Sequence, residues 1–451
     1  MTKLFKEMLI KIPDEVQYII NTLENNGYEA YAVGGCVRDS LLGNEPKDWD
    51  VCTSAPPAQT MKYFESQNII ETGLKHGTIT LRLNHKSFEI TTYRIDGVYA
   101  DNRRPENVEF TGDLREDLSR RDFTINAMAY NPATGIVDFF DGAADLKRKI
   151  VRCVGDADKR FQEDALRIMR ALRFASVLNF SIENNTATAV CGNKTLLHNI
   201  SAERIANELN LLLTGYNTGN ILLNFSSIIY EIIPELKEIA GFQQNNPYHH
   251  LDVWNHTITS VLNAPTDAAL RLTMLFHDIA KPKCYTETDG TGHFYGHPQI
   301  SSDMAGKILL RLKYDNKTIK TVTQLILYHD TDIKPEKKHV KRWLNRIGEE
   351  RLRQLIEVKK ADAMAQSEKF NSKKIAVLDD ISLIINKVIE ERECFSLKEL
   401  AANGNDLIAA GIPKGAAVGE ILNQLLNKVM DESVENDRIK LLAMAQELRK
   451  C

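Results

Sequence analysis

The sequence lacks the features that mark a secreted, disulfide-bonded or membrane-spanning protein. Its seven cysteines are scattered and none forms a Cys-x-x-Cys pair, so we expect a reducing cytosol, with no disulfide framework and no zinc knuckle. The N-terminal segment has no apolar signal core, and no apolar run approaches the roughly 20 residues that span a bilayer. We therefore expect a cytoplasmic protein that does not contact membranes and has no evident obligate protein partner.

An excess of positive charge is also missing. The net charge is −4 over 451 residues, which argues weakly against a nucleic-acid-binding protein, although local basic stripes can bind RNA within an acidic chain. The 43% of hydrophobic and 26% of charged residues are typical of a globular protein. The length predicts three or four domains, and the sequence contains no internal repeat or low-complexity linker.

Secondary-structure patterns change near residue 150. Residues 28–33 predict a strand that runs into a glycine pair, and residues 78–83 and 87–93 predict a hairpin around Asn84-His85. We therefore predict an α+β fold with a mixed α/β head followed by an elongated all-helical neck, body and tail. Helices are predicted at 158–179, 202–214, 218–239, 252–263, 267–280, 301–313 and 316–329, and domains at 1–150, 151–240, 241–370 and 371–451.

Asp48 and Asp50 form the most informative pair in the chain. In a strand, residues i and i+2 face the same side, so both carboxylates are expected to point into one space. Two acids this close repel each other unless a cation lies between them, and two Mg²⁺ ions about 4 Å apart are the usual arrangement in phosphoryl-transfer sites. Glu89, on a neighbouring predicted strand, is a candidate third catalytic acid. The alternatives are solvated acids at a strand end and an outward-facing glutamate.

A glycine pair precedes these acids. Gly34 and Gly35 can present backbone N–H groups to phosphate oxygens at the start of a helix, and Arg38 can reach the same phosphates. The pair alone also fits a tight strand-to-helix turn with no ligand. The conjunction with the acid pair within 17 residues favours a phosphate site.

Two further segments carry candidate nucleotide-binding residues. Arg121 can bind a triphosphate and Asp122 can accept a hydrogen bond from a ribose hydroxyl, or Asp122 can simply cap a helix. In the predicted helix at 158–179, an acid and two arginines recur at i, i+3 and i+6 and share one flank. Such spacing usually makes a surface ion-pair ladder, but it can also read the edge of a base and neutralise phosphate. The residues concerned are Asp164, Arg167 and Arg170, with Arg173 continuing the line.

In their order along the chain, these motifs resemble the class II CCA-adding tRNA nucleotidyltransferases and their poly(A) polymerase relatives, in the polymerase-β-like nucleotidyltransferase superfamily. The likeness covers residues 20–240 and includes Glu203-Arg204-Ile205. It implies that the Asp-x-Asp acids bind Mg²⁺ and that the arginines surround a nucleotide. The implied roles are metal binding by Asp48 and Asp50, triphosphate binding by Gly35, Arg38 and Arg121, base pairing by Asp164 and Arg167, and completion of the pocket by Arg170 and Arg173.

The resemblance also implies a reaction. The 3′-hydroxyl of tRNA attacks the α-phosphorus of CTP or ATP, so that C, C and A are added without a nucleic-acid template while the protein grips the tRNA 3′ end and acceptor arm. Residues 96–112 resemble the family's flexible loop, in the form typical of enzymes that add the terminal A. A poly(A) polymerase or an A-adding enzyme stays open as an alternative. From a different class, so does a phosphohydrolase acting on RNA ends.

A second candidate metal site lies further along the chain. Six of the eleven histidines fall between residues 249 and 297, and imidazole with carboxylate suits a divalent transition metal, or Mn²⁺ and Mg²⁺ when acids dominate. The pattern resembles an HD domain, the metal-dependent phosphohydrolase fold, and implies cleavage of cyclic phosphates or phosphomonoesters at RNA ends. The implied ligands are His256, His277, Asp278 and Asp362, with Asp330 as a rival for the last role and His297 and His329 for a second metal.

The C-terminal part holds two candidate RNA contacts. A basic cluster at residues 334–346 surrounds Trp343; such a run is usually a solvated helix face, but it can also meet tRNA phosphates. Residues 404–419 resemble the tail segment of the same family, in which a Gly-Pro turn joins two helices.

Overall fold

The computed structural model describes residues 10–97, 107–248 and 250–449. The chain divides into two compact units, Met1–Pro234 and Glu235–Cys451, and each is described by itself. The division lies close to the domain edge predicted at residue 240. The finer division into four domains stays a prediction.

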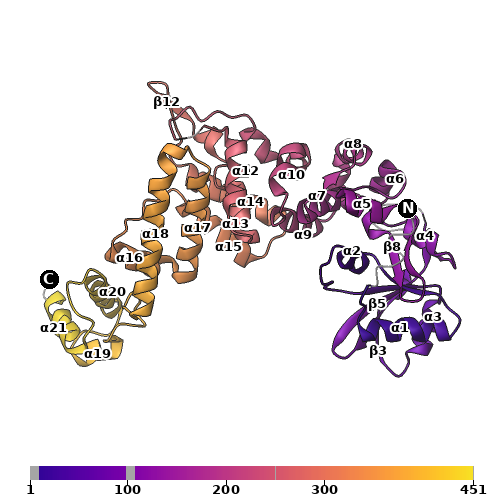
Figure 1. The fold of residues 1–451 in the computed structure, drawn as a ribbon. Helices are drawn as coiled ribbons and strands as arrows, with labels where there is room; N and C mark the ends of the chain where they lie inside the picture. The colour runs from indigo at the N-terminus through magenta and orange to yellow at the C-terminus, as the bar shows by residue number, and fades with distance from the viewer. Residues whose placement is uncertain (1–9, 98–106, 249, 450–451) are drawn as a thin grey trace. The chain divides into compact units, whose positions relative to one another are not determined.

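A seven-stranded sheet forms the centre of the first unit (Figure 1). The strand order is β3-β4-β5-β2-β1-β8-β9, and every neighbouring pair is antiparallel except β2 with β5. Helix α1 (Asp14–Asn25) packs its apolar stripe against the sheet beside α3 (Pro57–Tyr63). The strands are β1 Ala30–Val33, β2 Asp50–Thr53, β3 Asn68–Gly73, β4 Thr78–Leu83, β5 Lys86–Thr92, β8 Met128–Asn131 and β9 Gly135–Asp138.

The predicted hairpin and first strand are confirmed. Strands β4 and β5 are joined through Asn84 and His85, whose φ angles of 48° and 64° match the left-handed residues of a type I′ turn. Strand β2 begins at Asp50, so Asp48 precedes the strand instead of belonging to it. Of the predicted loop at 96–112, residues 98–106 lie outside the described residues. The flanks of that loop contribute to the short pair β6 (Arg94–Asp96) and β7 (Val108–Phe110).

The turn from β1 into α2 (Gly35–Leu41) depends on Gly34. Its φ of +82° is a left-handed conformation, and a Cβ there would lie 3.0 Å from Nη1 of Arg121. A Cβ on Gly35 would lie 3.7 Å from Nη2 of Arg38, an ordinary contact. Only the first glycine of the pair is therefore required by the backbone.

The rest of the first unit is mainly helical, and two predicted helices are broken. The helix predicted at 158–179 ends at Glu163 and restarts at Leu166, because Asp164 adopts φ −131° and ψ 102°. The helix predicted at 218–239 breaks at Phe225 and again at Ile233, which precedes a proline and so disfavours the helical region. The helices are α4 Leu114–Ser119, α5 Gly142–Arg148, α6 Ala157–Glu163, α7 Leu166–Leu178, α8 Asn184–Gly192, α9 Ala202–Leu213, α10 Thr218–Asn224 and α11 Ser226–Ile232, with the short strands β10 Ile150–Val151 and β11 Ser181–Ile182.

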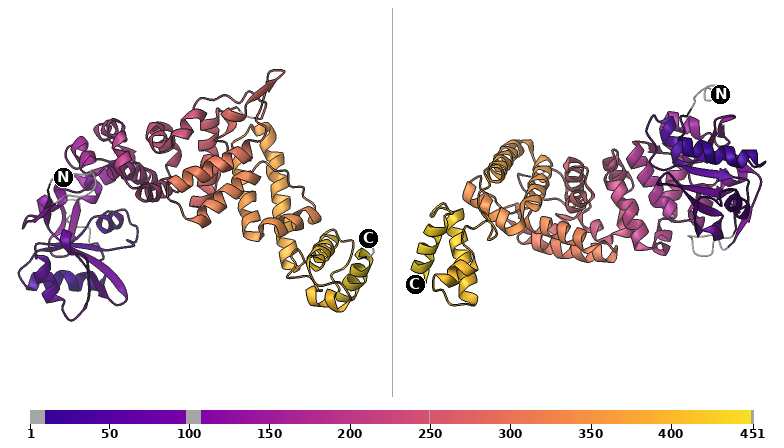
Figure 2. Two further views of the ribbon diagram at one scale, coloured as in Figure 1. Left: turned by 180° about the vertical axis from the view of Figure 1, so that it is seen from behind. Right: turned by 90° about the horizontal axis from the view of Figure 1, so that it is seen from below.

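The second unit is built from helices and one small hairpin. Asp252, Asp267 and Asp315 each accept a backbone N–H from the first turn of the following helix, so short acidic residues set three of the helix starts. Helices α17 and α18 lie side by side in both views of Figure 2. The elements are α12 Val253–Asn263, α13 Ala268–Phe276, β12 Thr286–Thr288, β13 Thr291–His293, α14 His297–Arg311, α15 Asn316–Tyr328, α16 Lys337–Ile347, α17 Glu349–Met364, α18 Glu368–Glu390, α19 Gly404–Ala409, α20 Ala416–Met430 and α21 Arg438–Leu448.

Membrane-spanning helices were not expected from the sequence. Within the ranges that the structure describes, no helix combines the length and the apolar character that a bilayer crossing requires.

The basic cluster at residues 334–346 lies mostly on α16 and is largely ion-paired. Lys337 and Lys341 both pair with Glu393, and Arg342 approaches Asp431 to 2.7 Å. These contacts join α16 to the start of the tail. The cluster therefore has fewer charges available for RNA than its sequence suggests.

Replacing Gly34 by alanine should destabilise the first unit by about 1 kcal/mol or more, because the new side chain meets both a left-handed backbone and the Arg121 guanidinium. Gly35→Ala is the matched control and should cost less. Thermal unfolding of both variants checks this, and equal losses would contradict the assignment.

Candidate active site and metal centre

The predicted acid pair reaches the surface on one side of the sheet. Asp48 and Asp50 are exposed, whereas Trp49 between them is buried with 8% of its surface exposed. This alternation directs the two carboxylates to the same side, although Asp48 lies just before the strand.

Strand register places the third predicted acid beside Asp50. Glu89 is the direct partner of Asp50 in the parallel pairing of β2 with β5. Phe88 and Ile90 on either side of Glu89 are buried, so this carboxylate is also directed outward. The other neighbour of Asp50 is Val33 on β1, the residue directly before the glycine turn. The register thus brings the acids and the turn together.

The carboxylates of Asp48, Asp50 and Glu89 repel one another. Burial, the Glu89 carboxylate and, more weakly, Asp48 raise the pKa of Asp50 to about 6, and Arg121 opposes this shift. Burial is the larger cause of this shift, but Glu89 and Asp48 also add like charge beside Asp50, and a divalent cation would neutralise that repulsion. The donor set, all carboxylate oxygen, is the kind that Mg²⁺ prefers. The residues present therefore fit a magnesium site.

Arg121 lies under the glycine turn. Burial lowers the pKa of its guanidinium, but Asp117 and Asp50, among neighbouring groups, outweigh burial and raise it. Its Nη2 lies 3.5 Å from Asp117 Oδ2, and its buried Nε has no hydrogen-bond acceptor among the described residues. Arg121 thus places a fixed positive charge between the acids and Gly34, where a triphosphate would need one.

Asp122 holds together the other predicted arginines. Its Oδ2 accepts hydrogen bonds from Nε and Nη2 of Arg170 at 2.8 and 2.5 Å, and its Oδ1 accepts from Asn126 at 3.1 Å. Asn126 Oδ1 in turn accepts from Arg38 Nη1 at 2.6 Å. Arg170 and Asn126 hold the pKa of the Asp122 carboxyl well below its usual range, against the effect of burial. Its role at a ribose stays a prediction.

Phe174 is an aromatic platform that the sequence reasoning missed. The guanidinium carbons of Arg38, Arg170 and Arg173 lie 5.1, 5.3 and 3.9 Å from the centre of its ring. These are cation–π distances, so the ring helps to hold three like charges together. Phe174 directly follows Arg173 in the sequence, and this adjacency could have indicated an aromatic contact with the arginine.

The predicted helical alignment of Asp164 with Arg167 is wrong. Asp164 lies in the break between α6 and α7, where its Oδ1 accepts the backbone N–H of Leu166 at 3.1 Å and so caps α7. Its Oδ2 accepts from Nη2 of Arg204 on α9 at 3.2 Å. The two residues are still close along the chain, but they are fixed by different elements.

Arg167 is positioned by contacts from α6 and from the residue after α4. Its Nη1 donates to Glu163 Oε2 at 2.7 Å and to the carbonyl oxygen of Arg160 at 3.1 Å, and its Nη2 donates to the carbonyl oxygen of Arg120 at 2.8 Å. Sequence reasoning also missed Glu208, whose Oε2 lies 2.5 Å from Arg173 Nε. Glu208 is a buried acid on the apolar face of α9, and that pattern was visible in the sequence.

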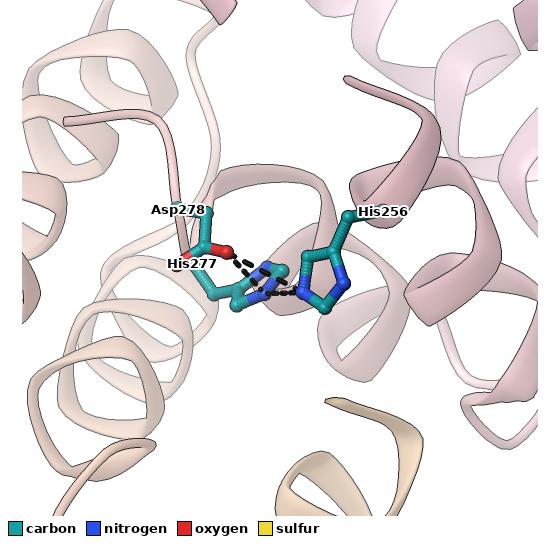
Figure 3. A group of neighbouring side chains, drawn as sticks. All are labelled: His256, His277 and Asp278. Atoms are coloured by element: carbon teal, nitrogen blue, oxygen red, sulfur yellow. Dashed lines mark hydrogen bonds and ion pairs between the residues drawn. The ribbon is translucent and has the colours of Figure 1, made fainter. Parts of the chain in front are cut away.

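The second unit gathers the predicted histidines and acids into one buried cluster. His256 comes from α12, and His277 and Asp278 directly follow α13, as Figure 3 shows. Nε2 of His256 and of His277 lie 3.4 and 3.2 Å from Asp278 Oδ2 and 3.0 and 3.7 Å from Asp362 Oδ1. Asp362, on α17, thus takes the place for which Asp330 was the rival. Asp330 is exposed in the turn after α15.

The remaining two histidines approach the other oxygen of Asp278. Nε2 of His297 and of His329 lie 3.3 and 3.8 Å from Asp278 Oδ1. Ligand atoms of two triads, His256–His277–Asp278 and Asp278–His297–His329, are each close enough to hold one ion. Asp278 belongs to both triads and can therefore bridge two metals.

The imidazoles are oriented as metal ligands usually are. Burial and the neighbouring His277 and His297 lower the pKa of His329 to about 3, which keeps this ring neutral. Oδ2 of Asp278 also lies 2.7 Å from Nζ of Lys281, so this buried ammonium group compensates part of the carboxylate charge. In three rings Nδ1 lies 2.7 or 2.8 Å from a backbone carbonyl, leaving Nε2 for a metal: His277 with Met274, His297 with Phe294 and His329 with Ile326.

Asp50→Asn should stabilise the metal-free protein at about pH 7.5. The pKa of Asp50 in the folded state, about 6, lies above the ordinary 3.8, so its contribution to stability falls as pH rises through 6. The gain should shrink on acidification and vanish near about pH 4, where the carboxyl is protonated in both states. Thermal unfolding in chelator across this range checks it. Glu71→Gln, an exposed acid on β3, is the control, and an equal gain there would contradict the cause.

Three protein families match parts of the chain. The family described as Poly A polymerase head domain matches residues 30–152, the RNA and SrmB-binding site of polymerase A matches 179–239, and tRNA nucleotidyltransferase domain 2 matches 288–445. The first of these contains the sheet with the three acids.

Relatives match the chain along nearly its whole length. The CCA-adding enzyme of Lactobacillus delbrueckii subsp. bulgaricus is 34% identical over 423 residues, which cover 93% of this chain and 94% of the relative. That of Streptococcus thermophilus is 31% identical and covers 97% and 98%. The solved structure of the Bacillus stearothermophilus CCA-adding enzyme in complex with CTP is 28% identical, with a TM-score of 0.69 over 97% of this chain and 98% of that one. The chain belongs to the family of the CCA-adding enzymes.

Proposed function

We propose that this chain adds C, C and A to the 3′ end of tRNA, using CTP and ATP and no nucleic-acid template. The observation that carries the proposal is the register that puts Asp50 beside Glu89, with Asp48 and the Gly34 turn next to them. It occurs in a chain of which relatives named CCA-adding enzymes match 93% and 97%.

The reaction follows from the residues at this edge of the sheet. The 3′-hydroxyl of tRNA releases its proton to solvent and its oxygen attacks the α-phosphorus, the bond to the bridging oxygen breaks, and pyrophosphate leaves with the electron pair. Asp48 and Asp50 would hold Mg²⁺, with Glu89 beside them; the ion supplies charge neutralisation for the triphosphate and acidifies the attacking hydroxyl. Arg121, fixed beside Gly34, binds the triphosphate.

The base is selected by side chains whose positions are fixed before the nucleotide binds. Asp164 is fixed by Arg204 and Arg167 by backbone carbonyls, so their donors and acceptors keep a constant separation. Preorganised groups of this kind recognise a base without the entropic cost of ordering flexible side chains. Arg170 and Arg173 neutralise charge on the wall of the same pocket.

Incubation with tRNA that lacks its CCA end tests the proposal. CTP alone should give two added nucleotides and CTP with ATP should give three, whereas Asp48→Ala or Asp50→Ala should reduce addition by about a thousandfold or more, the loss expected for several kcal/mol of charge stabilisation. Product length on a sequencing gel is the measurement.

His277→Ala is the matched control for this assay, because it removes a charged cluster in the other unit and should leave addition unchanged. A long A tract would identify a poly(A) polymerase, and refusal of CTP would identify an A-adding enzyme. Either result would overturn the proposal.

The buried histidine–aspartate cluster supports a second candidate activity, metal-dependent hydrolysis of phosphate esters. Its six side chains come from α12 and α17, from the residues directly after α13 and α15, and from the first residue of α14, and Asp278 contributes both of its carboxylate oxygens. The two triads would each hold a divalent transition metal, which would polarise a phosphate and acidify a water molecule. Water adds to phosphorus, the ester P–O bond breaks, and the leaving oxygen takes a proton from that water.

Metal analysis tests this second activity separately. The wild-type protein, equilibrated with Mn²⁺ or Ni²⁺ and freed of excess metal, should retain about two ions per chain, and His277→Ala should lose most of this metal. His293→Ala, in the β12–β13 hairpin outside the cluster, is the control and should keep it. Equal metal content in all three, measured by mass spectrometry, would exclude the site.

A further inference from the structure

A pocket of about 420 Å³ adjoins the histidine–aspartate cluster, and nothing above assigns it a ligand. Its walls come from the turn after α15 and from helices α17 and α18. Two of the cluster's own residues, His329 and Asp362, line it. The pocket is within the range of volumes in which small ligands bind.

The pocket lies beside the most exposed side chain of the cluster. The side chain of Asp362 is 20% exposed, whereas those of His256, His277 and Asp278 are at most 1% exposed and that of His297 is 8% exposed. The ligand with the largest exposed fraction is therefore one that lines the pocket. A molecule occupying the pocket would touch the cluster through Asp362 and His329.

Four lysines line the same pocket, and they have different tasks. Lys359 is tied down, because its Nζ donates to the carbonyl oxygens of His329 and Thr331 at 2.7 and 2.8 Å. Its pKa is lowered by burial, while Asp362 and Asp330 oppose that shift. Lys359 thus positions the turn that carries His329.

The other three lysines are on the first turns of α18. Lys369, Lys373 and Val377 recur at intervals of four, and so do Lys374 and Leu378, so each row presents a cation and then an apolar side chain to the pocket. Lys373 and Lys374 are exposed, and Lys374 Nζ donates to Gln366 Oε1 at 2.7 Å. Ammonium groups at a pocket mouth are suited to phosphate oxygens, and Lys374 would exchange its contact with Gln366 for a phosphate oxygen.

The apolar residues narrow the class of ligand. Ile333, Val377 and Leu378 line the pocket alongside the lysines. Inorganic phosphate or polyphosphate would leave this apolar surface unused, whereas the planar base of a nucleotide would cover it. Asp330 and Asp332 at the turn offer acceptors for ribose hydroxyls or a base amino group.

We propose that this pocket binds a nucleoside with two phosphate groups, one at the Asp362–His329 edge and the other at the α18 lysines. The inference rests on the proposed phosphoesterase activity for its first contact. A nucleoside 3′,5′-bisphosphate has this chemistry, and so does the 3′-phosphorylated terminal nucleotide of an RNA.

Calorimetric titration of the full-length, metal-loaded protein with adenosine 3′,5′-bisphosphate tests the pocket. The double variant Lys373→Ala/Lys374→Ala should weaken binding by about tenfold or more, as expected when two charge-assisted contacts are removed. Lys387→Ala is the matched control: it is on α18, beyond the pocket, and its side chain is 64% exposed. Both variants should add CTP to tRNA at the wild-type rate, which verifies that the first unit and the fold are intact.

Two further titrations distinguish a free nucleotide from an RNA end as the ligand. An RNA oligonucleotide with a 3′-phosphate is compared with the same RNA ending in a 3′-hydroxyl, on wild type and on the double variant. A lysine-dependent preference for the 3′-phosphate supports RNA ends, and lysine-dependent binding of the free bisphosphate alone supports a free nucleotide.

Metal content measured on the same preparations tests the pocket assignment and the phosphoesterase activity independently of each other. Metal-loaded protein whose affinity for both probes is unchanged by the double substitution would overturn the pocket assignment and leave the phosphoesterase intact. Lysine-dependent binding by protein that holds no metal would support the pocket and exclude the phosphoesterase.

Discussion

The parallel pairing of β2 with β5 is the constraint on which the first unit depends. It sets Asp50 directly beside Glu89, and the antiparallel pairing on the other side sets Asp50 beside Val33. One register thus concentrates negative charge next to the glycine turn. Since like charges at this distance cannot all be stable without compensation, the same register creates the need for Arg121 and for a divalent cation.

Charge compensation continues among the side chains predicted to bind the nucleotide. Arg170 is held by Asp122, Arg173 by Glu208, and Asp164 by Arg204. Partly buried charges must be paired or hydrogen-bonded to be tolerated, and the pairing also fixes their positions. The network joins the segment around Asp122 to α7 and α9, so these charged side chains are held in place by one another.

In the second unit, the ends of helices position the charged and metal-binding side chains. The last carbonyls of a helix lack intrahelical partners, and His277 and His329, just after α13 and α15, each place Nδ1 against the carbonyl three residues back. That contact orients the ring and leaves Nε2 facing the centre. The same helix ends and α17 bring Asp278 and Asp362 to those nitrogens, and the opening beside Asp362 leads to the lysine-lined pocket.

Local features were accessible from the sequence because they depend on neighbours along the chain. The β4–β5 hairpin, the Gly34 turn, the outward direction of Asp48 and Asp50, and the adjacency of His277 with Asp278 all follow from spacing of a few residues. The single helix predicted through Asp164 was wrong for a physical reason as well. An aspartate can either continue the helix before it or accept a backbone N–H at the start of the helix after it, and periodicity alone does not show which conformation is the more stable. The sequence by itself determined which chemistry is present. Only the tertiary structure decided that Asp362 and not Asp330 meets His256, that Arg204 pairs with Asp164 and Glu208 with Arg173, and that lysines of α18 line a pocket beside Asp362, because packing of distant elements sets those distances.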